Sequence, residues 1–259
     1  MRVLFIGDVI GKYGRNAVGE LLPQIKEEYK IDFTILNGEN SAGGIGLTLQ
    51  TAQELLDYGV DVISGGNHSF AHKEIEDLFI DGSLSVIRPL NYPPGVLGRG
   101  YTVKNSVAVV NLIGRVFING ALDCPFRAMD HLLANTPALP KVIIVDLHAE
   151  ATSEKRALGY YLDGRVSAVL GTHTHVPTAD EQILPQGTAY ISDVGMCGSV
   201  YSVIGDEPQE VINRFLIGIH SRLSVAKDNH VVLNGVVVDI DETSGKATSI
   251  QRVVREVYL

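Results

Sequence analysis

The stretch VLFIGDVIGKYGRNAVGELLPQIKEEYKIDFTILNGEN, residues 3–40, contains the first strand–helix–strand unit of the chain. Val3–Ile6 and Phe33–Leu36 are apolar runs with the length of buried strands. Between them, Arg15–Lys30 places Leu21 and Ile25 on one face of an amphipathic helix. Strands joined by a helical crossover pair in parallel. This stretch therefore predicts an α/β protein that begins with a parallel sheet.

The same alternation continues for a while and then changes. A helix, a strand and a second helix are predicted at Leu49–Tyr58, Val62–Ser64 and His72–Phe79, and the Gly/Pro-rich segment RPLNYPPGVLGRG, residues 88–100, predicts a loop. Further helices are predicted at Phe126–Ala134, Ser153–Leu162 (with Ser153 as its cap) and Gln209–Leu216, and further strands at Tyr101–Val103, Val107–Leu112, Val142–Leu147, Ala168–Gly171, Thr188–Ser192, Val231–Asp239 and Ala247–Val257. We expect antiparallel sheet in the C-terminal third, and one mixed α/β domain over residues 1–259 with two sheets.

Composition places the chain among ordinary globular proteins. Of its 259 residues, 45% are hydrophobic and 20% are charged. No apolar run approaches the about 18 residues of a membrane span. Gly7 and Asp8 interrupt the N-terminal apolar run too early for a signal peptide. We therefore expect a cytoplasmic protein in which the two cysteines, Cys124 and Cys197, stay reduced.

The charge balance limits the kind of partner. The formal net charge is −9. A protein that binds the backbone of long nucleic acids carries a basic stripe, so long RNA or DNA is an unfavourable partner. A small nucleotide remains compatible, because bound metal ions would reverse the local field.

Five predicted strands end in side chains that can bind a metal ion. They deliver Asp8, then Glu39 with Asn40, Asn67 with His68, His148, and His173 with His175. Ligand sites in α/β sheets lie at the carboxyl ends of strands, where distant residues meet. Each residue alone has a simpler structural role, as a helix cap, a turn former or a hydrogen-bonded core histidine. An unpaired buried polar group costs about 1–3 kcal/mol, so five such strand ends favour a shared site.

The donor types restrict the chemistry of that site. Carboxylate, amide and imidazole groups suit iron, manganese, zinc or cobalt, and no thiolate is among them. Two carboxylates, two amides and three histidines exceed the needs of one ion but suit two ions that share a carboxylate. Two ions about 3.5–4 Å apart form a clamp for phosphoryl chemistry. In an extended segment, His173 and His175 would point the same way and could face both ions.

Three short motifs, GD at 7–8, GNH at 66–68 and GTHTH at 171–175, resemble signatures of the calcineurin-like metallophosphoesterases. The chain departs from the usual patterns in three places. Ile10 stands where a histidine usually completes Asp-x-His. The usual Gly-Asp-x-x-Asp is Gly38-Glu39-Asn40-Ser41-Ala42, and the usual acidic residue after GNH is Ser69.

This altered set is similar to that of the YmdB-like bacterial phosphodiesterases. The matching stretches are FIGDVIGKYGR (5–15), NGENSAGGIGLT (37–48), RPLNYP (88–93), DLHAEATSEK (146–155), AVLGTHTHVPTAD (168–180) and ISDVGM (191–196). The resemblance extends from residue 2 to about residue 240. Phe70-Ala71 stands where that subfamily commonly has Trp-Asp, so we expect a different substrate-facing rim.

The resemblance implies a four-layer αββα sandwich of two mixed sheets, the metallophosphoesterase fold. It also implies a role for each candidate residue: Asp8, Asn40 and His175 bind one ion, Asn67, His148 and His173 bind the other, Glu39 bridges them, and His68 is the general acid that protonates the leaving alkoxide. The implied activity is hydrolysis of 2′,3′-cyclic and also 3′,5′-cyclic nucleotides by a metal-bridging hydroxide. The expected cofactors are two transition metal ions, iron first, with manganese or zinc as alternatives.

Three other functions compete with this hypothesis. A dinucleotide-binding oxidoreductase would suit the strand–helix–strand opening, but GDVIGKYG lacks the Gly-x-Gly-x-x-Gly spacing. A non-enzymatic regulatory protein could retain the same metal ligands. A nuclease on long RNA or DNA is disfavoured by the acidic charge. The resemblance also makes a homo-oligomer plausible.

Four further charged residues are weaker candidates. Asp146 and Asp193 could orient the ligating imidazoles, although solvation or helix capping is the simpler expectation for each. Arg88 and Arg115 could contact phosphate, although an exposed arginine is usually only solvated.

Overall fold

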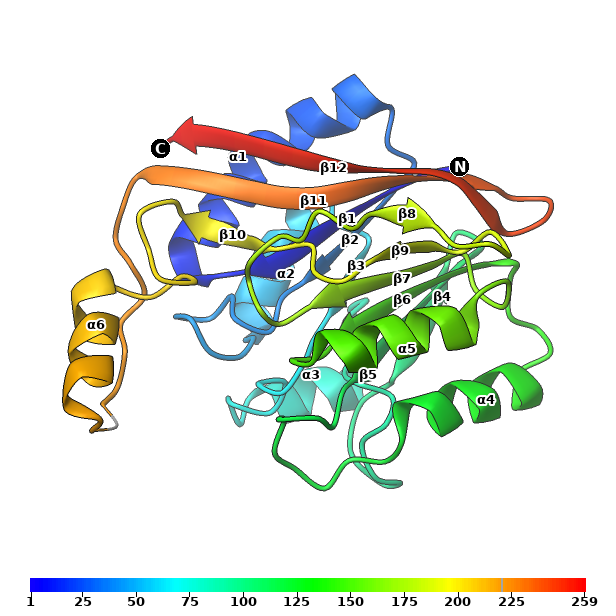
Figure 1. Ribbon diagram of the computed structural model, residues 1–259, viewed down its shortest axis with the longest axis horizontal. Helices are drawn as coiled ribbons and strands as arrows, with labels where there is room; N and C mark the ends of the chain where they lie inside the picture. Colours follow the sequence, from blue (N-terminus) through cyan, green and yellow to red (C-terminus); the bar gives the residue numbers. More distant parts are fainter. Residues whose placement is uncertain (220) are drawn as a thin grey trace.

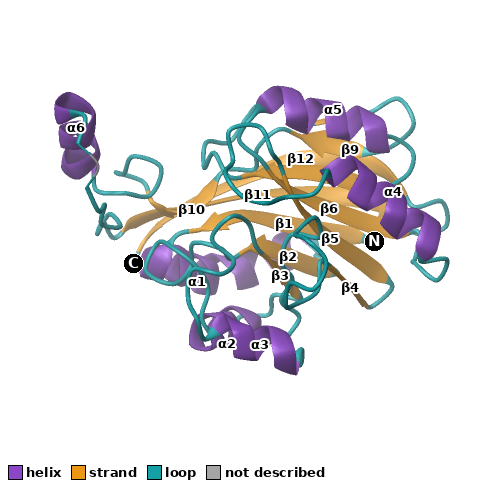
Figure 2. Ribbon diagram, turned by 90° about the horizontal axis from the view of Figure 1, so that it is seen from below, coloured by secondary structure: helices purple, strands orange, loops and turns teal. Residues whose placement is uncertain are grey.

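The computed structural model describes residues 1–219 and 221–259, which form two six-stranded sheets with helices on both outer faces (Figures 1 and 2). The helices are α1 (Gly11–Tyr29), α2 (Leu49–Asp57), α3 (Ile75–Asp81), α4 (Pro125–Asn135), α5 (Thr152–Leu162) and α6 (Pro208–Ile217). The strands are β1 (Arg2–Val9), β2 (Phe33–Asn37), β3 (Val62–Ser64), β4 (Tyr101–Lys104), β5 (Val107–Ile113), β6 (Val142–His148), β7 (Ala168–Thr172), β8 (Gln182–Ile183), β9 (Ala189–Ile191), β10 (Met196–Ser199), β11 (His230–Asp241) and β12 (Lys246–Tyr258).

Each sheet has a run of four parallel strands, which is flanked by antiparallel strands on one side in the first sheet and on both sides in the second. The first sheet has the order β12-β11-β10-β1-β2-β3, in which β10, β1, β2 and β3 run parallel. The second has the order β4-β5-β6-β7-β9-β8, in which β5, β6, β7 and β9 run parallel. Both sheets therefore collect the carboxyl ends of neighbouring strands along one edge.

Alternating side chains divide the apolar core into three layers. On β1, Val3 and Phe5 point into the layer between the two sheets, whereas Leu4 and Ile6 point toward α1, α2 and α3. A third layer, which includes Met129, lies between the second sheet and α4 and α5. The result is a sandwich of helices, sheet, sheet and helices, so the predicted αββα fold is confirmed (Figure 2).

This arrangement differs from the single doubly wound sheet of dinucleotide-binding oxidoreductases. It also brings the two sheets together at their carboxyl edges. The backbone N–H of His173, which follows β7 in the second sheet, donates a hydrogen bond to Asp8 Oδ2 of β1 in the first, at 3.1 Å. The residues predicted at separate strand ends therefore meet across the sandwich.

Three expectations about individual elements were wrong. The C-terminal third is not purely antiparallel, because β9 pairs in parallel with β7 and β10 pairs in parallel with β1. The helix expected at His72–Phe79 is α3, which begins at Ile75. Ser153 does not cap α5: the helix begins at Thr152, and the preceding Ala151 makes no side-chain capping bond.

Helix α6 stands apart from the layers at one end of the molecule (Figure 2). Only Val211 of this helix is buried. Phe215 and Leu216 are 83% and 77% exposed. None of the helices in the described ranges has the length and apolar character needed to cross a membrane.

Candidate metal centre

Asp8 lies at the floor of the candidate site with one oxygen unsatisfied. It is fully buried on β1, and no described residue forms a hydrogen bond with its Oδ1 atom. That atom lies 3.8 Å from His148 Nδ1 and 3.8 Å from His175 Nε2. A buried carboxylate oxygen without a donor is costly. A cation bound at this point would satisfy it.

Glu39 lies between the two halves of the site. Its Oε1 atom is 3.0 Å from His148 Nε2 and 3.3 Å from Asn40 Nδ2. Its Oε2 atom accepts a hydrogen bond from the backbone N–H of His68 at 3.0 Å. Gly66 makes this approach possible, because a Cβ there would collide with the Glu39 carboxylate and the His148 ring.

The three predicted histidine ligands turn ring nitrogens toward the same space. His173 Nδ1 lies 2.9 Å from His148 Nε2, and the oxygen of Asn67 lies 2.9 Å from the same Nε2 atom. His175 Nε2 lies 3.2 Å from the Asn40 amide. The structure thus brings all seven predicted ligands together: Asn67 and His173 lie next to His148, which contacts Glu39, and Asn40 lies next to both Glu39 and His175. Asp8 Oδ1 lies at the same distance from His148 as from His175.

Each imidazole gives its other ring nitrogen to an oxygen acceptor. His148 Nδ1 lies 3.0 Å from the hydroxyl of Thr172, and His173 Nε2 lies 3.2 Å from Glu150 Oε2. His175 Nδ1 lies 2.7 Å from the carbonyl oxygen of Ile204. Such outer acceptors fix the tautomer and ring orientation of metal-ligating histidines. Glu150 and Thr172 were missed as partners because each is an ordinary polar residue in the sequence.

Backbone strain positions two of these histidines. β7 ends at Thr172, and His173 and His175 have φ angles of 102° and 66°. Our expectation of an extended segment was therefore wrong, although both rings still face the same space, as expected. Left-handed backbone at residues other than glycine costs of order 1–3 kcal/mol and is concentrated at functional sites.

The buried charges of the centre perturb one another. Burial opposes ionisation of both His148 and Glu39, but their close contact outweighs it, raising the pKa of His148 to about 9 and lowering the pKa of Glu39 to about 2. Burial, followed by the charge on His148, lowers the pKa of His173 to about 3. Burial raises the pKa of Asp8, although the nearby His175 and His148 act to lower it.

Asp146 is part of a buried network beneath His148. Its carboxylate accepts hydrogen bonds from Ser64 at 2.5 Å and from Asn37 at 2.9 Å. It also accepts one from Thr172 at 2.7 Å, which leaves the Thr172 oxygen to accept from His148. Burial raises the pKa of Asp146 to about 6. Solvation, the simpler expectation for this residue, was wrong, and sequence reasoning missed Asn37 entirely.

Asp193 holds the loop that carries two of the histidines. It is buried, and its Oδ2 atom accepts hydrogen bonds from Lys155 Nζ at 2.7 Å and from the backbone N–H of Thr174 at 3.0 Å. Thr174 lies between His173 and His175. The simpler expectation of a solvated or helix-capping Asp193 was therefore wrong. A buried ion pair with Lys155 could not be predicted, because a lysine on a helix is usually solvated.

His68 and two arginines lie toward the rim. His68 is half-buried, next to Glu39 but outside the ligand cluster. Arg88 is buried, and its guanidinium group donates to the carbonyl oxygens of Pro89 and Val96, so it is unsuited to contact phosphate. Arg115 is exposed at the end of β5.

The donor set fits bound metal. Glu39, His148 and His173 each offer a ligand atom, and these atoms lie within 4.8 Å of one another. Asp8 Oδ1 and His175 Nε2, which lie 3.8 Å apart, offer further donors next to this group. Oxygen and imidazole donors of this kind suit divalent transition metals.

The fold defines the class of protein. Over 98% of its length, the structure superposes on 90% of the calcineurin-like phosphoesterase YfkN from Bacillus subtilis, with a TM-score of 0.56 and 10% identity. At this identity, the likeness concerns the fold alone. Within that fold class, the chain belongs to the YmdB-like protein family, which matches residues 4–253. The resemblance inferred from the motifs is therefore confirmed.

Two relatives cover nearly the whole chain. A Bacillus subtilis (strain 168) protein named 2′,3′-cyclic-nucleotide 2′-phosphodiesterase is 48% identical over 98% of this chain and 97% of its own length. A Mycoplasma pneumoniae protein described as a novel phosphatase has a crystal structure that matches with a TM-score of 0.92, at 36% identity over 99% of this chain and 93% of that one. Phosphodiesterase, the enzyme class predicted from the motifs, is the class named for the first relative.

Proposed function

We propose that this chain is a dinuclear metallophosphodiesterase that hydrolyses cyclic nucleotides, 2′,3′-cyclic nucleoside monophosphates first and 3′,5′-cyclic ones second. One observation carries the proposal: three imidazoles face a common buried space while their other nitrogens are held by oxygen acceptors. The activity named for the Bacillus subtilis relative supports the substrate class.

The proposed ligand roles follow the two halves of the site. Asp8, Asn40 and His175 would hold one ion, Asn67, His148 and His173 the other, and Glu39 both. Bound transition metal ions would supply an activated water and neutralise the charge of the phosphodiester. Iron, manganese and zinc all accept these donors. We propose iron as the first choice, with manganese or zinc as alternatives.

The chain itself would supply the proton for the leaving group. His68 is half-buried beside the cluster, and its backbone is anchored on Glu39 Oε2. Its imidazolium N–H would donate to the ribose oxygen as the P–O bond breaks, which turns an alkoxide into an alcohol. A ribose alkoxide is a poor leaving group, so this proton matters most for natural substrates.

The direct test is hydrolysis of bis-p-nitrophenyl phosphate and of adenosine 2′,3′-cyclic phosphate by protein prepared with and without oxygen. We expect about two metal ions per chain by elemental analysis, loss of activity with a chelator, and recovery with Fe²⁺ or Mn²⁺. At most one ion per chain after reconstitution would contradict the dinuclear mechanism. Two bound ions without turnover would instead favour the non-enzymatic regulatory protein.

A homo-oligomer and a cytoplasmic location stay predictions. The exposed apolar residues of α6 are the surface at which we test the homo-oligomer. Light scattering on the purified protein and on a Phe215→Ser variant would show whether copies associate through this helix. A monomer at micromolar concentration would contradict the oligomer.

A further inference from the structure

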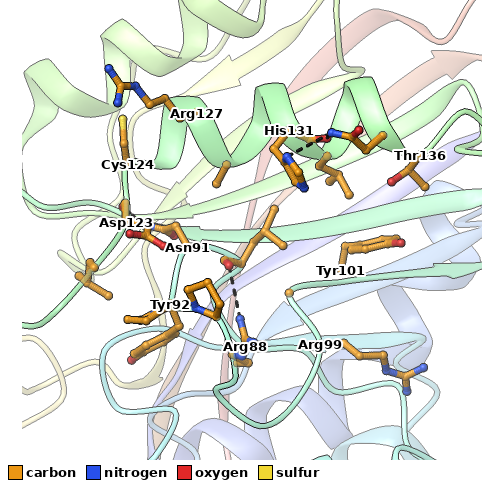
Figure 3. A pocket seen from close by; sticks show the side chains of 18 of the residues that line it. Arg88, Asn91, Tyr92, Arg99, Tyr101, Asp123, Cys124, Arg127, His131 and Thr136 are labelled. Carbon is orange, nitrogen blue, oxygen red and sulfur yellow. Dashed lines mark hydrogen bonds between the residues drawn. The ribbon is translucent and has the colours of Figure 1, made fainter.

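A large cavity lies beside the metal centre, between α4 and the segment that follows Arg88. Its volume is about 1110 Å³. Arg127, Cys124 and Asp123 lie at one end, and Thr136, Tyr101 and Arg99 lie at the other (Figure 3). We call this space the α4 cavity. Pockets that bind small molecules have volumes of about 300–1,000 Å³, so the α4 cavity is large enough for a ligand of that size.

The near end of the α4 cavity is connected to the metal centre through the backbone. Asn91 lines the cavity and donates to the carbonyl oxygens of Ile113 and Asp123, at 2.8 and 2.9 Å. Ile113 is the β5 residue paired with His148 on β6. The N–H of Gly114 donates to the carbonyl oxygen of His148 at 2.9 Å. One strand therefore separates this wall of the cavity from a proposed metal ligand.

Tyr92 joins the two spaces on the solvent side. It lines the α4 cavity, and its ring contacts Phe70 edge-on with centroids 5.4 Å apart. Phe70 lies two residues after His68. Burial raises the pKa of Tyr92, and the Glu39 carboxylate raises it further, which is consistent with a position near the metal centre. Tyr92 is therefore the residue of the cavity lining that contacts the segment carrying His68.

The lining of the α4 cavity is cationic in a protein of net charge −9. Four arginines and one carboxylate line it. Arg88 is committed to backbone carbonyl oxygens and Arg99 donates to Gly82. In contrast, no described residue pairs with the guanidinium groups of Arg115 and Arg127, both of which are exposed. Two cations are therefore available to an anionic ligand.

The walls also offer surfaces for a nucleobase. Tyr92 lies near one end and Tyr101 near the other, with apolar Leu90 and Leu132 among the lining residues (Figure 3). Proteins that bind single-stranded nucleic acid combine a cationic groove with aromatic rings on which bases stack. The overall negative charge restricts such binding to a short chain.

We propose that the preferred substrate is a short oligoribonucleotide whose terminal nucleotide carries a 2′,3′-cyclic phosphate. The α4 cavity binds the preceding nucleotide, which is the neighbour on the 5′ side of that terminal nucleotide. This inference rests on the proposed function, because it assumes that the phosphodiester is cleaved beside His68. In this proposal the phosphate that links the two nucleotides pairs with Arg115 and Arg127, and the base of the preceding nucleotide stacks on Tyr92, the tyrosine that contacts Phe70. The added contacts lower KM rather than raise kcat, because they are made equally in the ground and transition states.

The test compares adenosine 2′,3′-cyclic phosphate with the dinucleotide ApA that ends in a 2′,3′-cyclic phosphate. We expect kcat/KM of the metal-loaded protein to be about tenfold higher for the dinucleotide, mainly through KM. Arg127→Glu is expected to bring this ratio close to one, and Arg127→Lys to retain most of it. Arg222→Ala, which changes an exposed arginine outside the cavity lining, is the matched control and should keep the ratio. A ratio near one in the unaltered protein, or a ratio insensitive to Arg127→Glu, would overturn the inference while leaving the proposed function intact.

A binding measurement decides the inference even if neither substrate is hydrolysed. Fluorescence anisotropy with a labelled diadenylate, in chelator, reports on the cavity without turnover. Weaker binding by Arg127→Glu and by the Arg115→Ala/Arg127→Ala double variant, with no change for Arg222→Ala, supports the cavity as a nucleotide site. Equal binding by all of these proteins refutes it.

Discussion

The metal centre and the α4 cavity lie one strand apart but differ in how their charges are held. At the centre, Asp8 and Glu39 are buried, and each of the three imidazoles proposed as ligands has an oxygen acceptor for its outer nitrogen. In the α4 cavity, Arg115 and Arg127 are exposed, and their guanidinium groups have no partner among the described residues. Buried charges must be matched during folding, because an unpaired buried ion costs several kcal/mol. Exposed arginines remain available for a ligand.

This difference assigns separate tasks to the two regions. The centre is preorganised, so a change there should alter metal binding and the chemical step. The α4 cavity is open, so a change there should alter the choice among substrates. A mutation in the centre that changed only the choice among substrates, or a mutation in the α4 cavity that changed metal binding, would contradict this assignment.

The largest effect is expected from the proposed general acid. His68→Ala should lower kcat on adenosine 2′,3′-cyclic phosphate by about 10²–10⁴-fold, because the alkoxide must then leave without its proton. The loss should be much smaller on bis-p-nitrophenyl phosphate, whose leaving group is stable as an anion. Metal content, measured by elemental analysis, should stay unchanged. Equal losses on both substrates would show that His68 is not the acid.

A smaller effect is expected from the support of His148. Thr172→Val keeps the shape of the side chain but removes the oxygen that accepts from His148 Nδ1. Loss of such an outer partner typically lowers metal affinity about 10–100-fold. Competition with a chelator would measure this loss. Thr188→Val removes the hydroxyl of another buried threonine, which donates to the carbonyl oxygen of Val166 at 2.7 Å, and is the matched control. Unchanged affinity in Thr172→Val would contradict the orienting role.

The pH should affect metal binding and stability in opposite directions. Since the pKa of His148 is raised to about 9 from 6.5, metal must displace a proton from it below pH 9. Metal affinity should therefore rise by up to about tenfold per pH unit toward pH 9 and then level off. In metal-free protein, the stabilisation from protonated His148 is complete below pH 6.5 and is lost as the pH rises through about 9.

Calorimetry in buffers of different ionisation enthalpy would count the released proton, and thermal unfolding of the metal-free protein would follow the loss of stability. His148→Asn should abolish both pH dependences. His72→Asn, which alters a histidine outside the centre, should retain them. A metal affinity independent of pH between 6.5 and 9 would refute the role of the His148–Glu39 pair.

Much of the fold was predictable, and so was the meeting of the candidate ligands at one place, because both depend on local sequence patterns. The unbroken apolar run Val3–Ile6 already indicated a strand buried on both faces. Strand ends carrying Asp8 and Glu39 pointed to one edge, because parallel strands share their carboxyl side. The boundary of α3 and the cap of α5 were less predictable, since neighbouring contacts decide where a helix begins.

Tertiary structure alone decided what surrounds those ligands. Thr172, Glu150 and Ile204 hold the three imidazoles from different parts of the chain, and their residue types gave no signal of this role. The left-handed backbone of His173 and His175 also depends on surrounding contacts such as the hydrogen bond from Thr174 to Asp193. The sequence by itself determined which groups could bind metal, because donor chemistry belongs to the side chain. Their orientation, and the α4 cavity beside them, depended on the packing of two sheets and their helices, because distances between remote residues exist only in the folded chain.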